Sequence, residues 1–179
     1  MRQLLTAALL VFIFVGCKKD KDEEDHSAQS FNFSSYHRYD INGNYLGSIG
    51  NTTDEKAHED WPDWVFDAFA PLDSINLTGY QVSEVTFDKI YPNPAADTQN
   101  IQVFATQPVN LKLLLVDNTK KVYYLRSIHV PAAIQRFGIS YANLNMPAGT
   151  NYRMFYGFSA EGKPFFKRGH VDIAYKIAQ

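Results

Sequence analysis

The segment around residue 60 holds the densest group of side chains that could do metal chemistry. It reads His58-Glu59-Asp60-Trp61-Pro62, which begins like the zinc motif His-Glu-x-x-His but lacks the second histidine. Pro62 would also interrupt a helix that carried both ligands. The acidic residues nearby could offer oxygen ligands to a divalent cation. We favour a solvated acidic loop, so the sequence predicts no metal site and no cofactor.

Two other segments begin like known functional loops and then depart from them. The run 157–163 matches Gly-x₄-Gly-Lys, but Pro164 stands where a phosphate-binding loop needs Ser or Thr. Ser159 is not the serine of a nucleophile elbow, because Glu161 replaces the required glycine. The run 40–44 begins like a calcium loop but lacks the later bidentate Glu. The five histidines show no ligand spacing, so we assign no catalytic residue and expect no enzyme activity.

Two tryptophans flanked by carboxylates are the strongest candidates for ligand binding. Trp61 and Trp64 could stack against sugar rings while Asp60 and Asp63 hydrogen-bond the hydroxyls. The same tryptophans belong to an apolar stripe at positions i, i+3, i+4, i+7 and i+8, which predicts a short helix at about 62–69. A helical stripe usually packs against a core. The tryptophans are therefore either a sugar-binding platform or a plug against the body of the protein.

The first residues are typical of an export signal that ends at the chain's one cysteine. After Arg2, all but one of the twelve residues in the run 4–15 are apolar. A membrane-spanning helix needs roughly 20 such residues, so residues 1–16 indicate a cleavable signal peptide. A small residue directly before Cys17 resembles the bacterial lipoprotein signal, in which the cysteine is lipidated and becomes the first mature residue. One cysteine also excludes a disulfide framework.

The stretch 17–30 is charged and nearly free of apolar side chains, which predicts a lipidated cysteine followed by a flexible, solvated tether. Its start, Cys17-Lys18-Lys19-Asp20, resembles lipoproteins of the Bacteroidetes, in which an acidic stretch after the cysteine marks export to the cell surface. The resemblance implies an outer-membrane protein anchored by lipid on Cys17. Because lysines interrupt the acidic run, the periplasmic face stays an alternative to the favoured cell surface. Asp73-Ser74-Ile75 resembles the O-glycosylation sequence of the same group, which implies modification of Ser74.

Charge divides the chain, although its total is nearly neutral, with 17 Lys+Arg and 19 Asp+Glu. This balance disfavours nucleic acid as a partner. Residues 27–88 carry 2 basic and 10 acidic side chains, net −8, whereas residues 89–179 carry 11 and 4, net +7. We favour packing of the two parts with partial neutralisation. The alternative is a basic face for an anionic partner such as lipopolysaccharide or an acidic glycan.

Short β-rich runs dominate the rest of the chain. Alternation over 31–41, the pair Asn42-Gly43 and the run 44–49 predict a β-hairpin, with both turn residues at positive φ. Seven later runs are separated by turn residues, at about 80–88, 100–106, 109–116, 121–129, 134–140, 151–159 and 165–177. The sequence therefore predicts an all-β, antiparallel sandwich domain over residues 31–179. The hairpin and one short helix occupy 31–75, and about seven strands form the core over 76–179.

Residues 87–179 resemble the C-terminal sorting domain of Bacteroidetes type nine secretion cargo. The resemblance rests on Tyr91-Pro92-Asn93-Pro94-Ala95, the strands 101–103 and 109–117, and Gly149 near Tyr152. It implies an Ig-like β-sandwich of about seven strands. We take it as an indication of fold and only weakly of secretion.

These patterns favour a lipid-anchored, non-catalytic envelope protein that binds a glycan or a partner protein. A small hydrolytic enzyme on the same scaffold is the alternative, and a purely structural envelope component is the third hypothesis. An exposed aromatic patch would favour binding. A strongly shifted acid or histidine inside a deep cleft would favour the enzyme. Buried tryptophans would count against the sugar platform.

Overall fold

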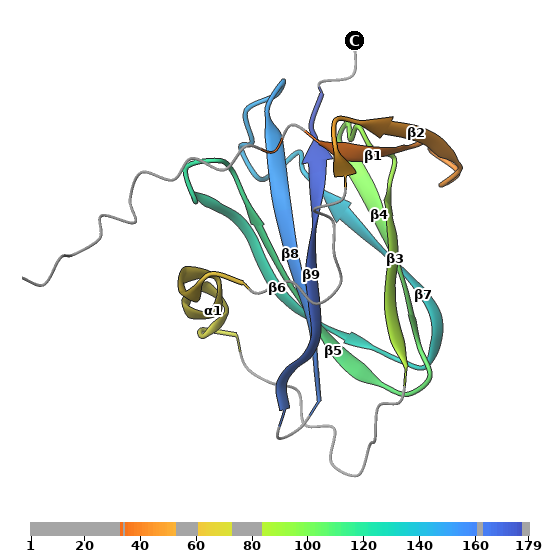
Figure 1. The fold of residues 1–179 in the computed structure, drawn as a ribbon, viewed down its shortest axis with the longest axis vertical. Coiled ribbons are helices and arrows are strands. Elements are labelled where there is room, and N and C mark those ends of the chain that lie inside the picture. The colour runs from red at the N-terminus through yellow and green to blue at the C-terminus, as the bar shows by residue number, and fades with distance from the viewer. Residues whose placement is uncertain (1–32, 34, 53–60, 73–83, 161–162, 177–179) are drawn as a thin grey trace, which may run out of the picture.

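The seven predicted strands form two antiparallel sheets in the computed structural model, which describes residues 33, 35–52, 61–72, 84–160 and 163–176 (Figure 1). One sheet contains, in spatial order, β3 (Val85–Tyr91), β4 (Thr98–Ala105) and β7 (Ala133–Ser140). The other contains β6 (Val122–Val130), β5 (Val109–Val116), β8 (Asn151–Ala160) and β9 (Lys163–Ala174). The chain crosses from one sheet to the other after β4, after β6 and after β7, as it does in Ig-like sandwiches. The predicted fold class is confirmed.

Several predictions lie outside the described residues. They concern the signal peptide 1–16, Cys17 with the tether 17–30, Asp60 and Ser74. Within the described ranges, no helix has the length and apolar character to cross a membrane. The same ranges hold no cluster of three or more His, Cys, Asp or Glu side chains placed to bind a metal ion.

The core is built around β5, whose eight residues are all buried. Its run of apolar residues is what a central strand covered on both faces requires. Leu111, Leu113 and Leu115 face the space between the sheets, whereas Leu114 and Val116 face the opposite side. The sequence pattern of this strand therefore accounts for both the sandwich core and the second, smaller core beneath the helix.

A tyrosine at the start of β8 fixes the loop that precedes the strand. The Tyr152 hydroxyl donates a hydrogen bond of 2.7 Å to the Pro147 carbonyl. This arrangement matches the tyrosine corner of Ig-like sandwiches. Burial is the main cause that raises the pKa of Tyr152 to about 12, so the hydroxyl keeps its proton and remains a donor.

The predicted helix is α1 (Asp63–Phe69), which covers the outer face of the four-stranded sheet (Figure 1). Val65 and Phe69 are buried against Leu114 and Phe155 of that sheet. A helix of seven residues has little stability alone, so its apolar face must pack to keep it folded.

The predicted hairpin consists of β1 (Tyr36–Tyr39) and β2 (Tyr45–Ile49), but its turn differs from the expected type. Gly43 has a positive φ of 79°, whereas Asn42 does not have a positive φ. The Gly43 amide donates to the Asp40 carbonyl, and the Asp40 carboxylate accepts the amides of Asn42 and Asn44. This carboxylate holds the turn in a conformation with one left-handed residue. The pairing of the two strands also contains a β-bulge, at the register shift between Arg38 and Tyr39.

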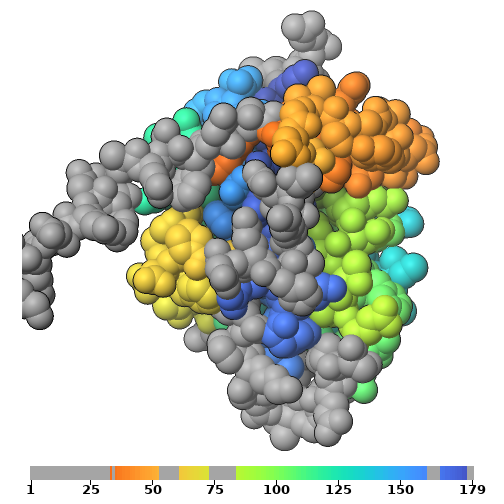
Figure 2. Space-filling model, in the orientation of Figure 1, coloured from red at the N-terminus to blue at the C-terminus, as the bar shows by residue number. Residues whose placement is uncertain are grey.

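The hairpin lies across one end of the sandwich, where it contacts β3 and β9. Figure 2 shows it standing out from the body at that end. The first core strand also differs from the prediction, because β3 continues to Tyr91 and so leads directly into the Pro92-Asn93-Pro94 segment. Both Tyr91–Pro92 and Asn93–Pro94 peptide bonds are cis. This segment lies next to the hairpin, because Asn93 pairs with Tyr39 through two backbone hydrogen bonds.

Candidate functional site

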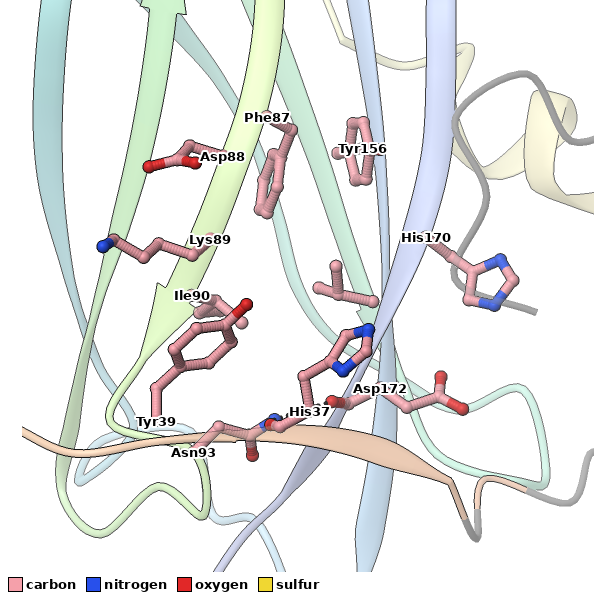
Figure 3. A pocket seen from close by; sticks show the side chains of 11 residues that line it. His37, Tyr39, Phe87, Asp88, Lys89, Ile90, Asn93, Tyr156, His170 and Asp172 are labelled. Carbon is pink, nitrogen blue, oxygen red and sulfur yellow. Dashed lines mark hydrogen bonds between the residues drawn. The ribbon is translucent and has the colours of Figure 1, made fainter. Parts of the chain in front are cut away.

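A pocket of about 200 Å³ opens between the edge strands β3 and β9, and the hairpin closes one end of it (Figure 3). Pockets for drug-sized ligands usually measure about 300–1,000 Å³. The pocket therefore fits a group the size of one sugar ring or one amino-acid side chain, with the remainder of a larger ligand outside.

The inner wall of the pocket is aromatic. Phe87 of β3 and Tyr156 of β8 stack across the gap between the sheets, with ring centroids 4.1 Å apart and an interplanar angle of 16°. Ile90 and Val171 extend this apolar surface along the two edge strands. The two stacked rings cover each other, so the wall exposes only a small part of either ring.

The hairpin supplies a second aromatic group, at the mouth of the pocket. Figure 3 shows the side chains of His37 and Tyr39 rising from β1 toward the space between β3 and β9. The Tyr45 ring lies 5.8 Å from the His37 ring and 5.7 Å from the Tyr39 ring, between centroids. Tyr45 is 59% exposed. The hairpin therefore presents an accessible tyrosine ring beside His37 and Tyr39, which line the pocket.

A chain of hydrogen bonds runs through the same residues. His37 Nδ1 and the Ser48 hydroxyl share a hydrogen bond of 2.8 Å, and the Tyr45 and Ser48 hydroxyls share one of 2.7 Å. Burial lowers the pKa of His37, which favours the neutral ring near neutral pH. A neutral imidazole and two hydroxyls can each donate and accept hydrogen bonds.

Polar residues of β3 form the opposite rim. The strand register shifts between Phe87 and Lys89, which leaves Asp88 as the additional residue of a β-bulge. Gln102 Nε2 donates 2.6 Å to the Asp88 carboxylate. Lys89 Nζ donates 3.0 Å to the Gly43 carbonyl, so this lysine ties β3 to the hairpin turn.

Asn93 joins the hairpin to the sandwich beneath the pocket. It is 1% exposed. Its backbone exchanges two hydrogen bonds with Tyr39, and its side-chain Nδ2 donates to the carbonyls of His37 and Asp172. Its Oδ1 accepts the amide of Ala174. The side chain thus uses both donors and its acceptor, and it fixes the position of β1 relative to β9.

His170 and Asp172 border the pocket but serve the other face of β9, as Figure 3 shows for the His170 ring. Arg153 holds the Asp172 carboxylate with two hydrogen bonds, from Nε at 2.7 Å and from Nη2 at 2.9 Å. Burial first, and the positive charge of Arg153 second, lower the pKa of His170 to about 3. Both residues are parts of the packed outer face of the sheet.

Among the described residues, each pKa that the surroundings shift moves away from neutral pH. Hydrogen bonds from Asn44 lower the pKa of Asp40. Burial would raise the pKa of Asp117, but the hydrogen bonds that it accepts from Thr119, Lys121 and Tyr123 lower it overall. Burial raises the pKa of the tyrosines 123, 124, 141 and 152 and lowers that of the histidines 37 and 170. A general acid or base works best with a pKa near the working pH.

The structure places the residues of the predicted sugar platform in different environments. Trp61 is 4% exposed, its ring stacks on Phe69 at 5.1 Å between centroids, and its Nε1 donates to the Gly169 carbonyl. Trp61 therefore packs beneath the helix, as expected if the tryptophans are a plug against the body of the protein, and its ring is not open to a sugar. Trp64 is half-buried, with Lys120 Nζ 5.7 Å from its ring centroid. Asp63 is exposed in the first turn of α1.

The aromatic residues of the hairpin were not among the predicted site residues. His37 and Tyr39 share one face of β1, and this parity is visible in the sequence. Nothing local indicates that β3 and β9 lie beside that face, since the hydrogen bonds that tie the hairpin to Lys89 and Asn93 join residues 46 and 56 positions apart.

Fold and site together define an Ig-like β-sandwich with an appended hairpin and helix. No family model and no curated protein matches the chain. Among solved structures, a crystal structure of Parabacteroides merdae β-glucuronidase, with glycerol in its active site, aligns with a TM-score of 0.36 and 12% identity. The alignment covers 51% of this chain and 14% of the length of that enzyme.

Proposed function

We propose that this protein is a lipid-anchored outer-membrane module that binds a glycan at the mouth of the pocket and does not catalyse a reaction. The observation that carries the proposal is the cluster of His37, Tyr39 and Tyr45 over an aromatic pocket wall. The lipid on Cys17 would hold the module at the membrane, with the cell surface favoured over the periplasmic face.

The chemistry of the mouth suits a sugar better than an apolar ligand. A pyranose ring presents C–H bonds on its face and hydroxyls around its edge, so it needs a ring to pack against and groups that both donate and accept hydrogen bonds. Tyr45 offers the ring, and His37 and Ser48 lie within the same hydrogen-bonded chain. Asp88 and Lys89 also border the pocket, but Figure 3 shows their side chains pointing away from it, and their hydrogen bonds join Gln102 and Gly43.

The pKa values support binding over catalysis. The histidine with the largest shift, His170, has a pKa of about 3, and it packs against Arg153 and Phe155 rather than lying in a deep cleft. Such a group is too weak a base to accept protons efficiently near pH 7.

A hydrolytic enzyme is the second candidate, because the His37–Ser48 hydrogen bond resembles a base paired with a nucleophile. Ser48 is exposed, and its hydroxyl also bonds Tyr45. A fluorophosphonate probe distinguishes the two functions. Labelling that disappears in Ser48→Ala would support the hydrolase, and unlabelled wild-type protein would support the binding module.

A glycan array with full-length protein tests the binding proposal, using neutral hexose, N-acetylhexosamine and uronate oligosaccharides. Tyr45→Ala should weaken binding of the array hits at least about tenfold, the loss expected when an aromatic side chain that packs on the ligand is removed. Tyr36→Ala is the matched control, because Tyr36 lies on the other face of the same hairpin. Equal binding by both variants would contradict the proposed site, and capture of a partner protein without any glycan would replace glycan with protein as the ligand.

The anchor has its own test. Cys17→Ser protein should leave the membrane fraction, because it loses the acyl chains that hold it there. Protein that stays with the membranes after this change would contradict the lipid anchor.

A further inference from the structure

The hairpin carries most of the exposed large apolar side chains in the part of the chain that the structure describes. Six such side chains are found there, and four of them belong to the hairpin or its turn: Ile41, Tyr45, Leu46 and Ile49. Tyr45 contributes to the pocket mouth. The other three form what we call the aliphatic patch (Ile41, Leu46 and Ile49), in which Ile41 is 65% exposed.

One residue of the patch, Ile49, turns away from the pocket. Ile49 pairs with Tyr36, and the neighbouring pair is Ser48 with His37. Because successive side chains of a strand point to opposite faces, Ile49 lies on the face opposite His37. Ile41 lies in the turn, and Leu46 lies at the bulge between the strands. The patch can therefore touch a surface through Ile49 without covering the face of β1 that carries His37.

The backbone of β2 is a poor template for an added strand. The strand has five residues, and Gly47 at its centre has a φ of 101°. The bulge at Arg38 and Tyr39 further twists the ribbon. Short, bulged edges resist pairing with another chain. What the patch offers is thus a set of aliphatic side chains, not a hydrogen-bonding ladder.

The described part of the chain begins with Phe33, at the end of the body where the hairpin lies. Phe33 is buried there, with the Arg153 guanidinium 4.7 Å from its ring centroid and its carbonyl bonded by Asn151 at the start of β8. Asn93 links the hairpin to the neighbouring end of β9. The 16 residues from Cys17 to Phe33 span at most about 55 Å when fully extended. The proposed tether therefore joins the body at the end that carries the hairpin.

We propose that the aliphatic patch inserts into the interface of the bilayer that holds the lipid on Cys17, an inference that rests on the proposed anchor. The anchor makes this insertion an intramolecular event, so three side chains suffice where they would not hold a free protein. The contact orients the body on the membrane and leaves the face with His37 and Tyr45 accessible.

Dye labelling of the full-length, lipidated protein in vesicles tests this orientation. With Cys17 acylated, Leu46→Cys supplies one free thiol for an environment-sensitive dye. Ala132→Cys, exposed at the opposite end of the sandwich near the start of β7, is the matched control. Vesicles of phosphatidylethanolamine and phosphatidylglycerol serve as the membrane. The Leu46 dye should emit at shorter wavelength and resist iodide quenching about fivefold better than the Ala132 dye.

The outcomes separate this inference from the anchor. Equal quenching of both dyes on protein that floats with the vesicles overturns the inserted patch and leaves the anchor intact. Protein that does not float with the vesicles overturns both. A second variant guards against a local effect of the label: with the dye at Ile49→Cys, the added change Ile41→Asp should abolish the protection while the circular dichroism spectrum stays that of the parent. Protection that survives Ile41→Asp also overturns the proposal.

Discussion

The helix α1 and the β1–β2 hairpin both precede the sandwich, and both carry aromatic and aliphatic side chains, yet they use them in opposite ways. Trp61, Val65 and Phe69 are buried against the sheet. Tyr45 and Leu46 of the hairpin are more than half exposed. The helix completes a core, whereas the hairpin is held to the body mainly by polar bonds.

The difference shows that aromatic content alone does not locate a binding site. The side chains of α1 cover an apolar sheet face that would otherwise meet water. Burial against this face is sufficient to explain why these side chains are apolar. The hairpin exposes apolar side chains to solvent. These side chains do not attach it to the sandwich, because the hydrogen bonds of Asn93 and Lys89 do so. Exposed apolar side chains grouped on one element indicate an interaction surface.

Trp61→Ala should have the largest effect on stability. Removing a buried Trp costs about 4 kcal/mol, since the cavity beneath α1 can close only in part. For a domain of this size the melting temperature should fall by about 12 °C. Urea unfolding monitored by circular dichroism measures the change. Trp61→Phe, which keeps most of the volume and loses the bond to Gly169, should lose much less, and equal losses would contradict packing as the main role of Trp61.

Asn93→Asp should destabilise by about 3 kcal/mol with almost no change in shape. A carboxylate cannot donate to the carbonyls of His37 and Asp172, and it would be buried beside them. The hairpin should loosen first, which amide exchange of Tyr39 would report. Asn118→Asp, at an exposed turn, is the control. Unchanged exchange at Tyr39 would show that Asn93 does not hold the hairpin.

The outer face of the four-stranded sheet, which holds His170, and the hairpin, which holds His37, should also respond differently to acid. The pKa of His170 is about 3 in the folded protein against 6.5 in the unfolded chain. The unfolded chain therefore binds the proton first, and the free energy of unfolding falls as pH drops through this window. The loss should be roughly 2 kcal/mol between pH 6.5 and about 4.5, where carboxylates contribute little. His170→Gln should remove this dependence and His37→Gln should leave most of it, and the reverse pattern would contradict the burial of His170.

Much of the fold can be predicted because its signals are local. Alternation and turn residues mark all seven core strands, and the run Leu111 to Val116 marks the central one. The hairpin turn shows the limit, because Asn42-Gly43 predicts the turn but not the Asp40 carboxylate that selects its conformation. Asn93 shows a further limit. Its side-chain partners lie 56 and 79 residues away, so the sequence marks a rigid segment without revealing what it joins.

The most direct test of the account compares one aromatic residue from each region. Tyr45→Ala and Trp64→Ala are each measured for binding to the strongest glycan-array hit by calorimetry, at a temperature where both variants are folded. The account predicts at least about a tenfold loss for Tyr45→Ala, with stability changed by less than about 0.5 kcal/mol, and unchanged affinity for Trp64→Ala. Loss of affinity in Trp64→Ala with full affinity in Tyr45→Ala would place the site at the helix and contradict the account.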